Sequence, residues 1–154
     1  MKKPLFLRLL IEFLWLLFAL ILALVFCYVL LGAVKNEFLL PLIFYNFLAI
    51  TYFRMILFTE ENLLIKNIVV RILFFMLNIP LFFAIIIQLQ DFFYLFDHYD
   101  INQFLRTDIV LDGDAALEVY QNFRTILIAS AVSSLMLILI LEFQLAKYIL
   151  KYFK

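Results

Sequence analysis

The chain has one cysteine, Cys27, and one histidine, His98, among its 154 residues. A single thiol cannot form an internal disulfide or a cysteine metal cluster, so paired-cysteine membrane oxidoreductases are excluded in their usual form. A single histidine excludes a haem that is held by two histidines of the same chain. With only two glycines, the chain has no glycine-rich phosphate loop. We therefore expect no metal ion and no cofactor.

Charged side chains are also scarce, at 16% of the residues, and twelve basic residues balance twelve acidic ones. A chain without net charge offers no basic surface for nucleic acid, which we exclude as a partner. Hydrophobic residues, in contrast, make up 68% of the chain. A soluble domain of this size could not cover so much apolar surface with so few polar groups. The composition therefore predicts an integral membrane protein, with the lipid bilayer as its surroundings.

Four apolar runs are long enough to cross a bilayer as α-helices, which takes about 20 residues. No polar linker divides them, so we predict a single polytopic domain over the whole chain. The predicted fold is an all-α membrane protein, a four-transmembrane-helix bundle with a polar outer loop at residues 90–113. The predicted spans are residues 5–31, 38–58, 68–89 and 123–146. The third helix is expected to begin before the membrane, near Glu60, and Asp114 is expected to cap the fourth.

The basic residues orient this array, because the cytoplasmic side of membrane proteins is enriched in Lys and Arg. With a cytoplasmic N-terminus, three basic residues fall on the outer side: Lys35, Arg106 and Arg124. The other nine fall toward the cytoplasm: Lys2, Lys3, Arg8, Arg54, Lys66, Arg71, Lys147, Lys151 and Lys154. Both termini are therefore predicted to be cytoplasmic. The small size and the short loops favour a bacterial inner membrane.

Each predicted span carries a charged residue one to three turns inside its cytoplasmic end: Glu12, Arg54, Arg71 and Glu142. Charges in lipid are costly, and they normally face the bundle interior and pair. Two bases and two acids could form one neutral layer of Arg–carboxylate pairs. We interpret this layer first as a structural clamp. The alternatives are a transport or proton pathway and a docking site for a partner within the membrane.

Helical phase supports an inward direction for three of these charges and gives Arg54 no polar companion on its own helix. Ala19 and Ala23 share the face of Glu12, and small residues four positions apart let helices approach closely. Asn78 lies deeper in the predicted third span. For its side chain we predict a hydrogen bond to a neighbouring helix rather than a ligand contact.

Seven of the twelve acids gather between residues 91 and 118, on the predicted outer side. They are Asp91, Asp97, Asp100, Asp108, Asp112, Asp114 and Glu118. The spacing from Asp108 does not fit a calcium-binding loop, because valines stand at its third and twelfth positions. The run Asp97-His98-Tyr99-Asp100 could contribute to a metal site. We interpret it as a solvated turn, and we expect the other acids to serve turns and caps.

A short amphipathic helix is predicted inside the outer loop. Asp100 and Gln103 resemble a capping box at a helix start. Ile101, Phe104 and Leu105 follow at helical spacing and form an apolar stripe. Such a helix is expected to lie on the outer membrane surface.

No nucleophile–base pair and no metal set can be assembled from the sequence, so we expect no enzyme activity. The favoured function is a small non-catalytic integral membrane protein, a subunit or accessory scaffold of a larger membrane complex, associating with other membrane proteins or with itself. The alternative is a small homo-oligomeric transporter or channel that uses Glu12, Arg71 and Asn78. A membrane enzyme ranks third, since its only candidate cluster is the acidic run around His98.

Overall fold

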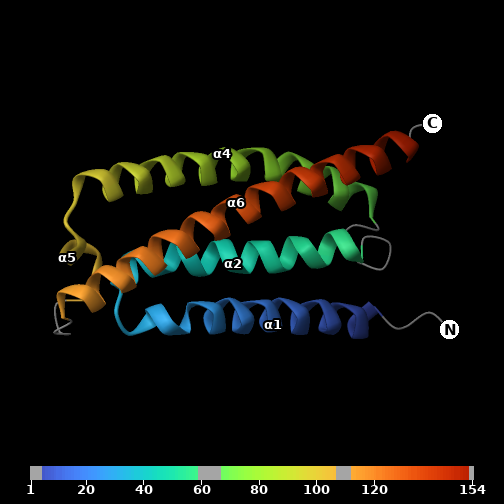
Figure 1. Ribbon diagram of the computed structural model, residues 1–154. Coiled ribbons are helices and arrows are strands. Elements are labelled where there is room, and N and C mark those ends of the chain that lie inside the picture. The colour runs from blue at the N-terminus through green and yellow to red at the C-terminus, as the bar shows by residue number, and fades with distance from the viewer. Residues whose placement is uncertain (1–4, 59–66, 107–111, 153–154) are drawn as a thin grey trace.

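The computed structural model describes residues 5–58, 67–106 and 112–152, and it is all-helical over those residues (Figure 1). Four of the described helices are long and apolar enough to cross a membrane. They are α1 (Leu5–Leu31), α2 (Asn36–Leu57), α4 (Ile68–His98) and α6 (Gly113–Tyr152). A single helical turn, α5 (Ile101–Phe104), lies between α4 and α6. The prediction of an all-α protein with four helices long and apolar enough to span a membrane is confirmed over the described residues.

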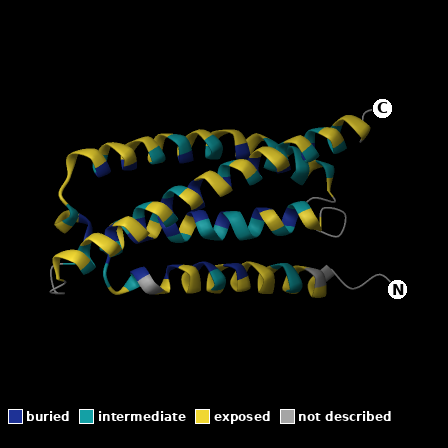
Figure 2. Cartoon of the chain, viewed as in Figure 1, coloured by how far each residue is buried: buried dark blue, intermediate teal, exposed yellow. Residues whose placement is uncertain are grey.

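Helices α2 and α6 pack against each other in the middle of the bundle, with α1 along α2 at one edge and α4 along α6 at the other (Figure 1). α6 packs against both α2 and α4 and crosses them diagonally. The two chain ends lie at one end of the molecule, called here the termini end, and α5 lies at the other, called the α5 end. Most side chains on the outward faces of the helices are exposed (Figure 2). An apolar exterior of this kind suits lipid as the solvent.

The contact between α1 and α2 is made by a narrow stripe on α1. Its buried residues, Ala19, Ala23, Cys27 and Leu30, recur every three or four positions and are at most 4% exposed. Two alanines in this stripe bring the two helix backbones close, as small residues do in membrane helix pairs. The rest of α1 is covered with exposed leucine, isoleucine, phenylalanine and valine side chains.

The helix that contains the predicted third span is longer than that span, because α4 continues nine residues past position 89, to His98, so the first part of the predicted outer loop is helical. The polar residues Gln90 and Asp91 suggested a loop, but both are exposed and remain helical. On the opposite face Phe92 and Phe96, four positions apart, are buried at 5% and 6% exposure. Residues four apart lie on one helix face, so the buried aromatic pair extends the helix although the outer face becomes polar.

The helix starts also differ from the predictions. α4 begins at Ile68 and not near Glu60, because the Asn67 side chain caps it by accepting a hydrogen bond from the Val69 amide at 3.0 Å. Glu60 itself is outside the described residues. α6 begins at Gly113, so Asp114 lies inside its first turn rather than at the cap.

The apolar stripe of α5 faces the protein and not a membrane surface, so this part of the prediction was wrong. Phe104 is 1% exposed and Leu105 is 5% exposed. The backbone explains the burial, since Lys35 donates its amide to the Phe104 carbonyl and Arg106 donates its amide to the Ala33 carbonyl. These two bonds attach the segment to the α1–α2 connection. Asp100 stands at the N-cap of α5, but its side chain makes no capping hydrogen bond there.

Candidate functional site

An ion pair joins α1 and α2 near the termini end. The Arg54 guanidinium lies 2.6 Å from the Glu12 carboxylate, and the two side chains are 16% and 12% exposed. Arg54 also lies over the ring of Trp15, 5.0 Å from its centroid. A cation between a carboxylate and an aromatic face is stabilised by both. The pair neutralises two of the four predicted intramembrane charges.

Sequence analysis had found no companion for Arg54, because helical phase compares residues on one helix only. The signal that could have found it is the hairpin register of α1 and α2. Glu12 lies 19 residues before the end of α1 at Leu31, and Arg54 lies 18 residues after the start of α2 at Asn36. Two antiparallel helices bring residues at equal distances from their connection to the same level.

A second polar group lies where α2, α4 and α6 meet. Asn78 is 2% exposed, and its side-chain oxygen accepts a hydrogen bond of 2.7 Å from the Tyr52 hydroxyl. The predicted helix-to-helix hydrogen bond of Asn78 is therefore present in the structure, between α4 and α2. The Glu142 side chain of α6 neighbours both Asn78 and Tyr52. Sequence analysis missed Tyr52, whose aromatic ring reads as ordinary apolar surface.

Two buried atoms of this second group lack hydrogen bonds within the described part of the chain. They are Nδ2 of Asn78, a donor, and Oε1 of Glu142, an acceptor. A third atom of this kind, Oγ1 of Thr51, belongs to the residue before Tyr52. Most buried polar groups in proteins are hydrogen-bonded, so these atoms mark the least satisfied part of the described interior. We call Tyr52, Asn78 and Glu142 the buried amide–acid group.

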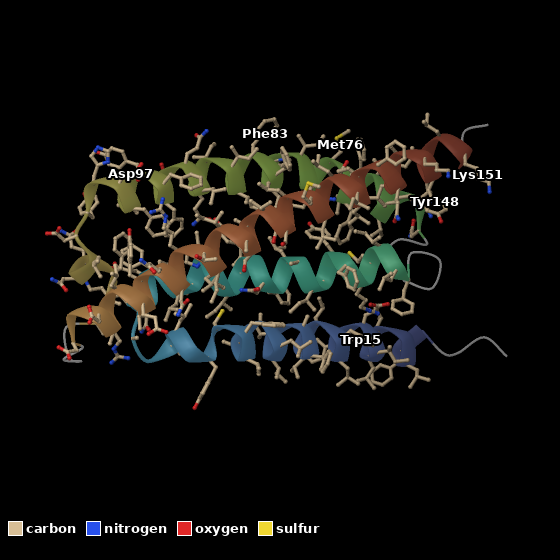
Figure 3. All side chains as sticks on the ribbon, in the orientation of Figure 1. Trp15, Met76, Phe83, Asp97, Tyr148 and Lys151 are labelled. Carbon is tan, nitrogen blue, oxygen red and sulfur yellow. The ribbon has the colours of Figure 1, made fainter. Side chains whose placement is uncertain are left out.

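Arg71, the fourth predicted charge, lies between α4 and α6. Its guanidinium is 5.2 Å from the centroid of the Tyr148 ring. Tyr148 and Trp15, which receive the two arginines, both lie toward the termini end (Figure 3). The four charges therefore share one half of the bundle, and the Glu12–Arg54 pair and the Arg71–Tyr148 contact join different helix pairs.

Hydrogen bonds in the middle of the bundle form a further polar set that sequence analysis missed. Ser134 donates to the Tyr45 carbonyl at 2.7 Å, and Ser130 donates to Oδ1 of Asn46 at 3.1 Å. The Tyr45 hydroxyl donates to Oε1 of Gln88 at 2.7 Å. These bonds tie α2 to both α6 and α4, and such bonds between membrane helices stabilise assembly. Two serines four positions apart in an apolar run are the signal that could have revealed them.

The acids of the predicted outer loop do not gather into one site. Six of the seven are described and all six are exposed: Asp91, Asp97, Asp100, Asp112, Asp114 and Glu118. Asp108 lies outside the described residues. His98 bonds locally, with Nδ1 3.0 Å from the Tyr94 carbonyl. Within residues 5–58, 67–106 and 112–152, no three His, Cys, Asp or Glu side chains lie close enough together to hold a metal ion.

The structure thus offers two candidate sites at the termini end, the Glu12–Arg54 pair and the buried amide–acid group. Comparisons with protein family models, with curated proteins and with solved structures found no match for this chain. A functional assignment therefore depends on the geometry of these side chains and of the surface around them.

Proposed function

We propose that this protein is a small non-catalytic integral membrane protein that acts as a subunit or accessory scaffold of a larger membrane complex. The observation that supports this function is the edge position of α1. This helix packs mainly against α2 and leaves most of its apolar surface uncovered. One face of it carries an open groove of about 330 Å³, lined by Ile11, Leu14, Trp15 and Phe18.

The groove lies beside the ion pair of Glu12 and Arg54. Trp15, one of its walls, is the ring over which Arg54 lies, and Arg54 is held by Glu12. Helix association in lipid depends on close packing of preformed surfaces. A groove whose wall is fixed by an ion pair is preorganised for such packing, which suits an accessory subunit.

Partner association is expected to depend on this groove. The double variant Leu14→Ala/Phe18→Ala should reduce the amount of partner that co-purifies in mild detergent about tenfold, which corresponds to about 1.4 kcal/mol. The matched control is Phe83→Ala/Ile87→Ala, which removes two side chains of α4 that are 57% and 59% exposed. An equal loss with both double variants, or a wild-type preparation that contains only this chain, would contradict the proposal.

The proposed orientation places both termini in the cytoplasm of a bacterial cell, with the α5 end outside the inner membrane. The imbalance of basic residues supports this orientation. It can be tested by cysteine labelling, since Cys27 is buried and can be replaced by alanine. In that background Asp97→Cys and Lys151→Cys place single thiols at opposite ends of the molecule (Figure 3).

We expect a membrane-impermeant maleimide to label the Asp97→Cys protein in intact spheroplasts. The Lys151→Cys protein should be labelled only after lysis. The reverse pattern would show that the orientation is inverted. Labelling of both the Asp97→Cys and the Lys151→Cys protein in intact spheroplasts would show that the two ends of the molecule do not lie on opposite sides of the membrane.

The alternative function is a homo-oligomeric transporter or channel using Glu12, Arg71 and Asn78. One observation favours it, namely the buried and unsatisfied amide nitrogen of Asn78. Glu12 contributes less to this alternative, because its carboxylate is paired with Arg54. Ion or solute flux in proteoliposomes that Asn78→Leu abolishes would favour transport over the accessory role.

A further inference from the structure

The buried amide–acid group combines the features of a site that can take up a proton. Glu142 lies ten residues before the last residue of α6, at Tyr152, which places it about 15 Å along the helix from its end at 1.5 Å per residue. Its side chain is partly exposed, whereas its Oε1 is buried. The residue is therefore only partly enclosed by the bundle, and its Oε1 lies on the enclosed side.

The interior side of Glu142 faces an amide that suits a carboxylic acid. An amide and a carboxylic acid can form two hydrogen bonds at once, with the acid O–H donating to the amide oxygen and the amide N–H donating to the acid carbonyl. The donor and acceptor of the second bond are Nδ2 of Asn78 and Oε1 of Glu142, which are two of the three buried side-chain atoms without a hydrogen bond in the described part of the chain.

Tyr52 orients the Asn78 amide for these two hydrogen bonds. Its hydroxyl donates to Oδ1 of Asn78 at 2.7 Å and fixes which way the amide points. An amide oxygen has two lone pairs, so Oδ1 can still accept the O–H of a carboxylic acid. A neutral acid is also much cheaper to hold in an apolar interior than a carboxylate.

From this geometry we propose that Glu142 is an exchangeable proton-binding site, closed on its inner side by the Asn78 amide and oriented by Tyr52. Uptake forms one O–H bond on the Glu142 carboxylate and breaks one O–H bond of a hydronium ion, leaving water. The proton comes from the solution at the termini end. This site is independent of the proposed docking groove, which lies on α1.

The charged and titratable groups toward the termini end come from all four long helices. Tyr52 faces it from α2, and Arg54 on the same helix is held by Glu12. On α4, Arg71 lies over Tyr148, which is a residue of α6 itself. A direct pairing of Arg71 with Glu142 is the competing arrangement, because it would keep the carboxylate ionised.

Infrared difference spectroscopy of the full chain in lipid nanodiscs tests the site. We expect a carbonyl band of a protonated carboxyl group that appears on acidification, shifts in heavy water and disappears in Glu142→Gln. The matched control is Glu12→Gln, which should keep the band, because Glu12 lies in the ion pair with Arg54 and not in the buried amide–acid group. Asn78→Leu should keep the band but move it to higher frequency, since the hydrogen bond to its carbonyl is lost.

Three results would overturn the proposal. A band that persists in Glu142→Gln would assign the proton to another residue. Absence of any band in wild type, with a band appearing in Arg71→Leu, would show that Glu142 is ionised and held by that arginine. An unchanged band frequency in both Asn78→Leu and Tyr52→Phe would show that the amide does not close the site. Circular dichroism of each variant confirms that it is folded and that its spectrum is interpretable.

Discussion

Arg54→Leu is expected to destabilise the protein by about 3 kcal/mol, the scale seen when one partner of a buried ion pair is removed. The substitution leaves the Glu12 carboxylate, only 12% exposed, without its counter-charge. It also removes the cation from the face of Trp15. The measurement is equilibrium unfolding in mixed micelles of mild detergent and SDS, followed by helical circular dichroism.

A double variant separates the lost pair from lost packing at this position. Glu12→Leu/Arg54→Leu should recover most of the stability, because no charge is then left without a partner. Arg124→Leu is the control arginine, which lies over Phe96 near the α5 end, 5.5 Å from the ring centroid. If the double variant is no more stable than Arg54→Leu, the ion pair does not hold α1 to α2.

Phe104→Ala is the second substitution with a large expected effect, again about 3 kcal/mol, as for other buried phenylalanines. At the α5 end, the Phe104 ring contacts aromatic rings of α2, α4 and α6. The centroid distances are 4.9 Å to Phe38, 5.4 Å to Phe96, 5.4 Å to Tyr120 and 6.4 Å to Phe123. The alanine variant leaves a cavity at the point where α2, α4 and α6 share one neighbour.

The control for this substitution is Phe83→Ala, which removes a ring that is 57% exposed on α4. Its expected effect is below about 1 kcal/mol, because an outward side chain exchanges few protein contacts for solvent or lipid. The loss of unfolding free energy in Phe104→Leu should lie between those of Phe104→Ala and Phe83→Ala, since leucine keeps most of the side-chain volume. Equal unfolding free energies for Phe104→Ala and Phe83→Ala would show that α5 does not pack as described.

The number of membrane-spanning helices could be predicted because it depends on local properties. A run of about 20 apolar residues is compatible with lipid only as a helix, whatever its neighbours. The bounds of α1 follow from its long apolar run, which only Arg8 and Glu12 interrupt. The end of α4 could not be read in the same way, since Gln90 and Asp91 interrupt the apolar pattern on one face while Phe92 and Phe96 continue it on the other.

The candidate site was only partly predictable, because charges in apolar runs stand out whereas their partners do not. The sequence singled out Glu12, Arg54, Arg71, Glu142 and Asn78 by residue type alone. Nothing local indicates that a tyrosine hydroxyl meets the amide, or that the carboxyl group of α6 lies beside it. Such pairs join residues on different helices, so they depend on how the helices are placed against each other.

By itself the sequence determined a four-helix membrane protein with a few charges that lipid would not tolerate unpaired. The tertiary structure decided which charges and polar groups meet. It paired Glu12 with Arg54 across the α1–α2 hairpin, and it placed Glu142 beside Asn78 and Tyr52 instead. The number of membrane helices can be predicted from the sequence because lipid solvates each apolar helix independently of its neighbours. Hydrogen bonds and ion pairs, in contrast, require two helices at a definite register and rotation.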